Sequence, residues 1–270
     1  MNTLGVVTVI QARVGSSRLP GKVLLPLGGT TVLQRQIERV RAATRVGTVV
    51  VATTTDRADD PIVALCEQTR TVCVRGHPTD LLARHCLAAS TFDARVVTKI
   101  PSDCPLIDPR VIDDVLAFFL ERPDLDYASN LHPPTEPDGF DVEVFSRTAL
   151  DLANREAAQP HEREHTTPFL WDQPDRFRLG NVRRADGRDY ATSHRVVLDY
   201  APDYDVIRAV FDALHPANPL FTVDDVIAWL DAHPALAALN HTYRGLSWYQ
   251  NHLDALRTLR PGAPFAAATA

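Results

Sequence analysis

The chain has 270 residues, of which 45% are hydrophobic and 23% charged, as is typical of a folded globular protein with a sizeable core. Its 28 Lys and Arg residues and 34 Asp and Glu residues give a formal net charge of −6, which argues against nucleic acid as a partner. No apolar stretch is long enough to span a membrane, and no signal pattern opens the chain, so we expect a cytoplasmic protein without a membrane partner.

The first predicted element is a buried parallel strand over residues 6–10, which are β-branched, apolar and too few for a helix. A loop rich in small and basic residues follows directly. In open α/β sheets ligands bind where such strands end, and glycines, hydroxyl groups and cations together suit a polyphosphate. The residues of these types in the loop are Arg13, Gly15, Ser16, Ser17, Arg18, Gly21 and Lys22.

Two common phosphate-binding motifs do not fit this loop. Five residues separate Gly15 from Gly21 where a P-loop needs four, and Val23 stands where it needs Ser or Thr. The Gly-x-Gly-x-x-Gly fingerprint of dinucleotide sites is absent as well. A solvated surface turn is the alternative, but three cations directly after a buried first strand are unusual in an acidic chain.

Helix and strand signals then alternate through the first half of the chain. Helices are predicted over 32–42, 60–69, 81–90 and 110–121, and strands over 48–52, 71–74 and 96–100. Thr30 and Thr31 open the first of these helices, and Asp80 is the expected N-cap of the third. The alternation with short connections predicts an α/β fold, with a doubly wound, Rossmann-like and mostly parallel sheet flanked by helices.

The regular alternation of helix and strand signals ends after about residue 130. A proline-rich loop over 130–139 leads into a predicted half-exposed strand over 140–145. Further strands are predicted over 177–182 and 195–198, and further helices over 146–158, 161–171, 203–214, 223–232 and 248–259. Thr222 and Asp225 form a capping-box-like start for one of them. We predict a single domain over 1–258 and a disordered tail over 259–270.

Two aspartates follow apolar strand signals at the predicted ligand edge of the sheet. Asp103 comes directly after the strand over 96–100, and Asp199 follows the apolar run 196–198. A carboxylate beside a polyphosphate needs a cation between them, and Mg²⁺ is commonly held by one or two carboxylates plus substrate phosphates. The positions of Asp103 and Asp199 therefore predict a Mg²⁺ site. The alternative is that each is simply a turn residue. Asp108, before Pro109, is instead the expected N-cap of the next helix.

Read in order, these segments resemble the cytidylyltransferase family that makes CMP-activated acidic sugars. The resemblance is closest to the spore-coat-polysaccharide branch, relatives of the CMP-Kdo and CMP-sialic acid synthetases. The matching segments are 10–22, 80–84, 103–108, 129–130, 138–145, 163–168 and 198–199. His85 stands where we would expect a tyrosine, and the region after Asn240 matches nothing in that pattern.

The resemblance implies a nucleotide-diphospho-sugar transferase type of fold, a role in polysaccharide biosynthesis and a Mg²⁺-dependent transfer of CMP from CTP to a 2-keto sugar acid, with pyrophosphate as the leaving group. It implies CTP binding by Ala12, Arg13, Gly15, Ser16, Ser17, Arg18, Lys22, Asp80, Arg84 and Ser102. Lys22, Arg18 and Asp103 would be catalytic, and Asp103 and Asp199 would hold the metal. The family also implies a homodimer, with 130–195 as the subregion for acceptor binding and dimerisation.

The acceptor residues have simpler alternatives. Asp141 and Glu143 share one face of a strand and could bind sugar hydroxyl groups, or form a solvated polar edge. Arg163 and His165 could receive an acidic group of the acceptor, or belong to a solvated helix face. For Asp80 and Arg84 of the nucleotide set, the i,i+4 spacing also fits a surface ion pair.

Three other functions compete. A metal-dependent glycosyltransferase would use an Asp-x-Asp motif, which Asp124-Leu125-Asp126 matches literally. A cytidylyltransferase could act on a phosphonate or a sugar phosphate with the same CTP half-site. A catalytically silent binding protein is the third, although no structural role demands Arg18, Lys22, Asp103 and Asp199 together.

Overall fold

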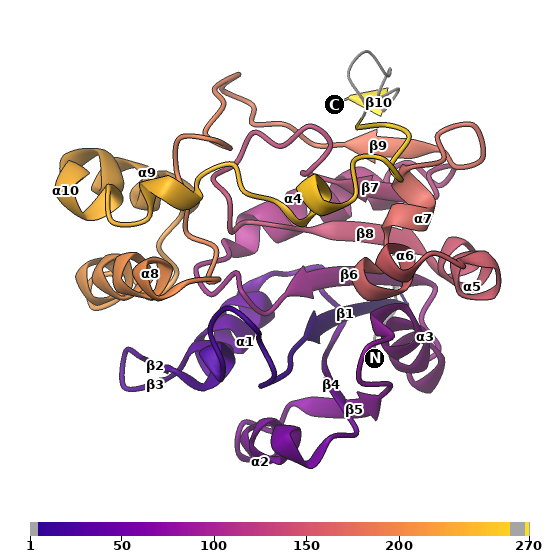
Figure 1. Cartoon of the computed structure of the whole chain (residues 1–270), viewed down its shortest axis with the longest axis horizontal. Coiled ribbons are helices and arrows are strands. Elements are labelled where there is room, and N and C mark those ends of the chain that lie inside the picture. The colour runs from indigo at the N-terminus through magenta and orange to yellow at the C-terminus, as the bar shows by residue number, and fades with distance from the viewer. Residues whose placement is uncertain (1–4, 260–267, 270) are drawn as a thin grey trace.

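The computed structural model describes residues 5–259 and 268–269. Within them, eight strands form one open sheet in the order β10-β9-β7-β8-β6-β1-β4-β5 (Figure 1). The strands are β1 (Val6–Gln11), β4 (Thr48–Thr54), β5 (Val72–Gly76), β6 (Val96–Pro101), β7 (Tyr127–Ser129), β8 (Glu143–Ser146), β9 (Leu179–Asn181) and β10 (Ala268–Thr269). All neighbours pair in parallel except β8, which is antiparallel to β6 and β7. A separate hairpin joins β2 (Pro26–Leu27) and β3 (Thr30–Thr31).

Helices cover both faces of the sheet, so alternate residues of the central strands enter two different cores. Val6 and Ile10 of β1 pack in one core, and Val7 and Val9 pack in the other. The first core takes α1 (Val32–Ala42), α2 (Asp60–Gln68), α4 (Pro109–Leu120), α8 (Ala201–Leu214) and α9 (Val223–Ala232). The second takes α3 (Leu81–Thr91), α5 (Arg147–Glu156) and α7 (Pro168–Trp171). The predicted doubly wound, mostly parallel sheet is confirmed.

Four predicted helix N-caps are also confirmed at the level of single hydrogen bonds. The side chains of Thr31, Asp80, Asp108 and Thr222 each accept a hydrogen bond from a backbone N–H in the first turn of the helix that follows. Capping of this kind satisfies donors that have no partner inside the helix, and it fixes where the helix begins.

Three predictions in the second half are wrong, for identifiable reasons. The strand over 140–145 is buried and not half-exposed, because β8 lies inside the sheet between β6 and β7. The helix over 161–171 is interrupted between α6 (Pro160–His165) and α7, where Thr166 takes a φ of 73° ahead of Pro168. The run 195–198 forms no strand, because its N–H groups bond to the loops around the site described below.

The C-terminal part differs as well. The predicted helix over 248–259 is reduced to the 3-10 turn η4 (Trp248–Asn251), preceded by the short α10 (Pro234–Ala237) and η3 (His241–Tyr243). Two more 3-10 turns, η1 (Lys22–Leu24) and η2 (Arg57–Asp59), lie in the first third of the chain. Except for residues 259 and 268–269, the predicted tail lies outside the described residues.

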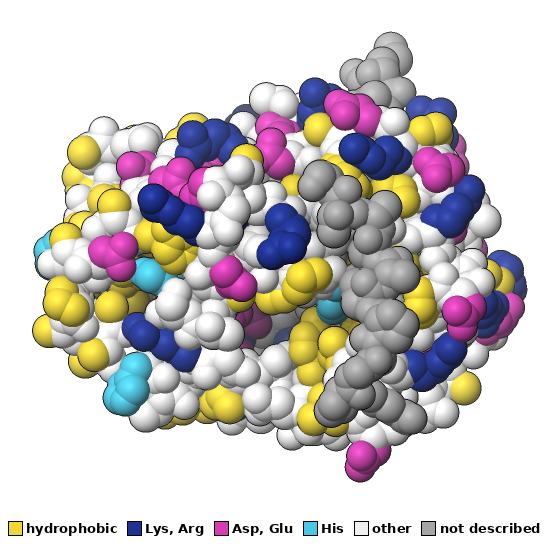
Figure 2. Space-filling view, turned by 90° about the horizontal axis from the view of Figure 1, so that it is seen from above, with side chains coloured by type: hydrophobic (Ala, Val, Ile, Leu, Met, Phe, Trp, Pro, Cys, Tyr) yellow, Lys and Arg dark blue, Asp and Glu magenta, His cyan; other side chains and the backbone are white. Residues whose placement is uncertain are grey.

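The surface agrees with the modest net charge. Figure 2 shows basic and acidic side chains interspersed over one face of the molecule, which is hollowed near its centre. None of the described helices is long and apolar enough to cross a membrane.

Asp108 supports a stability prediction, because its buried carboxylate caps α4 and also accepts the N–H of Val223 at the start of α9 (2.9 Å). Asp108→Ala removes the cap and leaves a buried donor without its partner. We expect the free energy of unfolding to fall by about 2 to 4 kcal/mol, measured by urea denaturation. Asp212→Ala, at an exposed position of α8, is the control and should change it by less than about 0.5 kcal/mol. Equal effects of the two substitutions would contradict the double capping role of Asp108.

Candidate active site

A large cavity of about 1220 Å³ opens at the carboxyl ends of β1 and β6. Its wall includes the loop after β1, the loop after β6, the 130–141 loop and residues from 191–200 and 245–252. The ends of central parallel strands are where open α/β sheets bind ligands. The predicted residues that line this cavity are Ala12, Arg13, Ser16, Ser17, Arg18, Lys22, Arg84, Ser102, Asp103, Asp141, Glu143, His165 and Asp199.

Lys22 lies at the centre of the polar part of the cavity. Its Nζ donates to Asp103 Oδ2 (3.1 Å), to Asp199 Oδ1 (3.0 Å) and to the carbonyl oxygen of Leu198 (2.6 Å). The residue is only 8% exposed. Burial alone would lower the pKa of its ammonium group, but the two carboxylates outweigh burial and the pKa is raised. Lys22 is therefore a fixed positive charge that joins three segments far apart in sequence.

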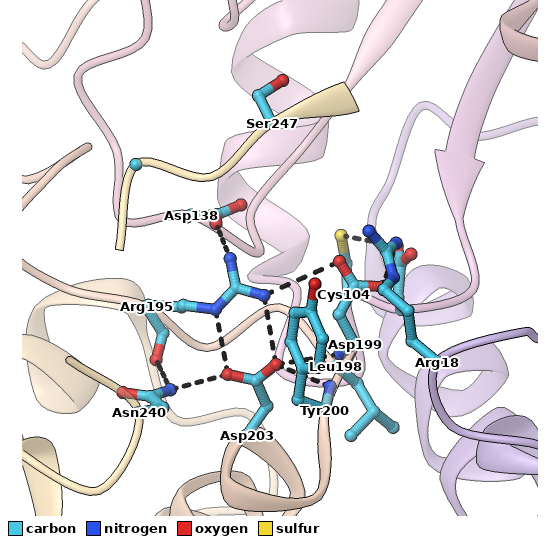
Figure 3. Close-up of polar contacts among 12 residues, drawn as sticks. Arg18, Cys104, Asp138, Arg195, Leu198, Asp199, Tyr200, Asp203, Asn240 and Ser247 are labelled. Carbon is cyan, nitrogen blue, oxygen red and sulfur yellow. Dashed lines mark hydrogen bonds and ion pairs between the residues drawn. The ribbon is translucent and has the colours of Figure 1, made fainter. Parts of the chain in front are cut away.

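Arg18 adds a second cation from the same loop. Its Nη2 lies 2.7 Å from Asp199 Oδ1, and its guanidinium carbon lies 5.5 Å from the centre of the Tyr200 ring (Figure 3). The Arg18 side chain is 48% exposed, whereas that of Asp199 is 14% exposed. The predicted basic loop and the predicted carboxylates are thus brought together, with Arg18 on the open side.

Arg195 holds the acidic residues from the other side, although no motif in the sequence marks it as a site residue. Its buried guanidinium contacts Asp138 (2.7 Å), Asp203 (2.9 Å) and, at longer range, Asp199 (3.6 Å) (Figure 3). Asp203 also accepts the N–H groups of Asp199 (3.0 Å) and Tyr200 (2.9 Å). This network fixes the backbone that presents Asp199, in place of the strand predicted there.

Asp138 also lines the cavity, and the sequence analysis did not identify it as a site residue. Burial, opposed by Arg195, raises the pKa of its carboxyl group to about 7, and burial also raises the pKa of Asp141 well above its usual range. Gly139, between them, has a φ of 119°, and a Cβ there would lie 2.6 Å from the backbone of Val196. Only glycine allows this close approach, so it is the sequence signal for the contact.

Another part of the cavity wall contains a buried ion pair. Lys99 Nζ contacts Glu143 Oε1, and the Tyr127 hydroxyl group donates to Glu143 Oε2 (2.8 Å). Burial would raise the pKa of Glu143, but Lys99 and these hydrogen bonds outweigh it and lower the pKa. Burial and nearby Lys99 lower the pKa of His165 to about 3, so its ring is neutral at physiological pH.

Three predicted binding residues are not among the described residues that line the cavity: Gly15, Asp80 and Arg163. Asp80 caps α3 and pairs with Arg163, whose Nε lies 2.9 Å from Asp80 Oδ2. The acceptor role of Arg163 therefore stays a prediction, and Asp80 pairs with Arg163 and not with Arg84 as the i,i+4 spacing suggested. The Arg84 side chain instead donates to the carbonyl oxygen of Ala52 (3.2 Å), and burial lowers its pKa to about 10.

The carboxylates fit a metal ion that the substrate helps to bind. Within the described residues, no group of three or more His, Cys, Asp or Glu side chains is placed to hold a metal. Asp103 and Asp199 each contact Lys22 through one oxygen, and each has a second carboxylate oxygen outside that contact. Two hard oxygen ligands suit Mg²⁺, which normally completes its shell with water and substrate phosphates. A site made by the protein alone is not present in these residues.

The Asp-x-Asp motif of the glycosyltransferase alternative lies elsewhere. Asp126 accepts the backbone N–H of Arg178 (2.9 Å) and pairs with its guanidinium group, so it connects the ends of β7 and β9. Neither Asp124 nor Asp126 is among the described residues that line the cavity. Asp126 therefore has a structural role where β7 and β9 begin.

The sheet, the basic loop after its first strand and the carboxylates opposite that loop define a nucleotidyltransferase. The sequence model of the cytidylyltransferase family matches residues 7–235, and the chain belongs to that family. It is 29% identical to the spore coat polysaccharide biosynthesis protein SpsF of Bacillus subtilis over 85% of this chain and 95% of that protein. It is 31% identical to a 3-deoxy-manno-octulosonate cytidylyltransferase of Chlamydia trachomatis, over 60% and 66% of the two chains.

A solved structure supports the same assignment. A cytidylyltransferase from Leptospira borgpetersenii superimposes with a TM-score of 0.82 at 28% identity, over 91% of this chain and 99% of that one. The chain is therefore a CTP-dependent nucleotidyltransferase, as the sequence resemblance predicted.

The raised pKa of Asp138 predicts a pH effect on stability. Because its folded pKa of about 7 lies above the unfolded value of about 4, the folded state binds more protons between these values. This group therefore lowers stability as pH rises through that window. Asp138→Asn keeps the shape of the side chain but cannot ionise. Between pH 5 and pH 8, the melting temperature of this variant should therefore fall less than that of the wild type. Asp212→Asn is the exposed control, and an unchanged pH profile in the Asp138 variant would refute the assignment.

Proposed function

We propose that the protein transfers CMP from CTP to a hydroxyl group of a 2-keto sugar acid and releases pyrophosphate, with Mg²⁺ as the metal. The observation that carries the proposal is the placement of Lys22 and Arg18 against Asp103 and Asp199 at one end of a cavity large enough for both substrates.

The phosphate end of the cavity supplies charge and position. Arg13, Ser16, Ser17, Arg18 and Lys22 all line it, and they offer cations and hydroxyl donors to a triphosphate. The oxygen of an acceptor hydroxyl group attacks the α-phosphorus in line and loses its proton to solvent, while the bond between the α-phosphorus and the pyrophosphate oxygen breaks. Such transfers depend mainly on positioning and charge neutralisation. Lys22 and Arg18 stabilise the negative charge that grows on the departing pyrophosphate.

Asp103 and Asp199 are the residues that would hold Mg²⁺. When bound there, the ion would neutralise phosphate oxygens and offset the negative charge of the two carboxylates. Their side chains are kept in place by Lys22 on one side and, for Asp199, by Arg195 on the other.

The acceptor end supports a small polyhydroxylated molecule. Asp138, Asp141 and Glu143 offer hydrogen-bond acceptors for hydroxyl groups, and Lys99 offers a cation for an acidic group. A sugar acid as substrate is also the chemistry named for the Chlamydia relative. The homodimer, the cytoplasmic location and the place in polysaccharide biosynthesis remain predictions.

The test is pyrophosphate release from CTP, ATP, GTP and UTP with Mg²⁺, in the presence of 3-deoxy-manno-octulosonate, N-acetylneuraminate or a hydroxyalkyl phosphonate. We expect release from CTP with a sugar acid. Asp103→Asn and Lys22→Met should each lower kcat by roughly a hundredfold or more, because each removes a charge that faces the phosphates. Asp124→Asn, which removes an exposed carboxylate of the rival motif, should leave kcat unchanged.

Other outcomes are decisive as well. Release with the phosphonate alone would keep the CTP half of the proposal and replace its acceptor. Absence of release with every pair, together with hydrolysis of a nucleotide sugar, would overturn it in favour of glycosyl transfer.

A further inference from the structure

The segment after the family match forms part of the cavity wall. The match ends at residue 235, yet Gly245, Leu246, Ser247, Trp248, Tyr249 and His252 line the cavity. We call residues 240–259 the strap. In Figure 1 this stretch crosses from α10 over the sheet towards β9. Part of the cavity wall therefore lies outside the residues that match the family.

The strap is fixed at both ends. At its start, the Asn240 side chain donates to the Arg195 carbonyl oxygen (3.1 Å) and to Asp203 Oδ1 (2.9 Å), which ties it to the acidic network (Figure 3). At its end, the N–H groups of Arg257 and Thr258 donate to the Asp172 carboxylate (2.8 and 2.7 Å). Residues between two such anchors are held in position over the cavity.

Trp248 is the main side chain of the strap at the acceptor end. Its ring stacks on His165 at 3.8 Å between centres and 10° between planes. Tyr249 next to it packs edge-on against Trp171 at 5.6 Å. Together with His165, these rings give this part of the cavity wall an aromatic surface. Glu143 and Lys99, on neighbouring strands, supply the charged groups of the same end.

An aromatic wall near carboxylates and one ammonium group suits a ligand with an apolar ring face and a polar edge. A sugar ring has this character, since its C–H groups lie on one face and its hydroxyl groups on the edge. We propose that Trp248 is a specificity-determining residue that stacks on the ring of the sugar acid acceptor, and that the strap completes the acceptor site. The inference rests on the proposed function and adds to it the residue that selects the acceptor.

The test compares Trp248→Ala and Trp248→Phe with Trp229→Ala in the full-length protein. Trp229 is a matched control, because it also stacks on a histidine, His233 at 4.1 Å, and is not among the described residues that line the cavity. Pyrophosphate release is measured with 3-deoxy-manno-octulosonate and with N-acetylneuraminate, varying each substrate in turn. Thermal unfolding shows whether each variant is folded.

We expect Trp248→Ala to raise KM for the sugar acid roughly tenfold or more, because it loses the stacking surface, and to leave KM for CTP within about twofold. Trp248→Phe should recover most of the loss, and Trp229→Ala should change neither KM. Should the alanine variant fail to fold, the phenylalanine variant and a Trp248→Leu variant, which keeps apolar bulk without an aromatic face, give the same comparison.

An unchanged KM for the sugar acid in the Trp248 variants, or equal increases in both KM values, would overturn the inference. Activity with a phosphonate but neither sugar acid would overturn it too, while leaving cytidylyl transfer intact. Failure of the proposed function is distinguished from these results by the absence of pyrophosphate release with every acceptor in the wild type, and the inference then falls with it.

Discussion

The site depends on one buried ammonium group. Lys22 contacts Asp103, Asp199 and the carbonyl oxygen of Leu198, so it joins the loops after β1 and β6 to a segment that begins 176 positions further along the chain. Removing one partner of such a buried pair leaves an uncompensated charge, which is strongly destabilising. The arrangement therefore forms as a unit, and the two carboxylates are held near each other beside the basic loop.

Arg195 is another buried cation that holds carboxylates in place. Arg195 binds Asp138 and Asp203 and lies 3.6 Å from Asp199, so the acidic side of the cavity has a fixed positive counterpart behind it. These cations differ in exposure. Lys22 and Arg18 extend from the loop after β1, and the Arg18 side chain is 48% exposed, whereas the Arg195 guanidinium group is buried and supports the carboxylates. Asn240 connects this network to the strap, and so links the phosphate end to the wall of the acceptor end.

The two ends of the cavity also differ in chemistry. The phosphate end is built from the loop at 11–22, which is charged and partly exposed. The proposed acceptor end contains Asp138, Asp141, neutral His165, aromatic side chains and the buried pair of Lys99 with Glu143. In the proposed function, the charged loop would bind the nucleotide, and the aromatic side chains would select the acceptor by shape.

Local patterns in the sequence were enough to predict the parallel sheet, the positions of the caps and the basic loop that lines the cavity. These patterns are apolar runs of strand length, capping side chains next to helix starts, and cations directly after a buried strand. Three other features exist only in the folded chain: Arg163 pairs with Asp80, Arg195 joins Asp138 to Asp203, and the strap reaches the cavity. The physical reason is that long-range ion pairs depend on which loops the sheet order brings together. The strap, likewise, is held by hydrogen bonds to residues up to 86 positions away in the chain and not by a periodic pattern of its own.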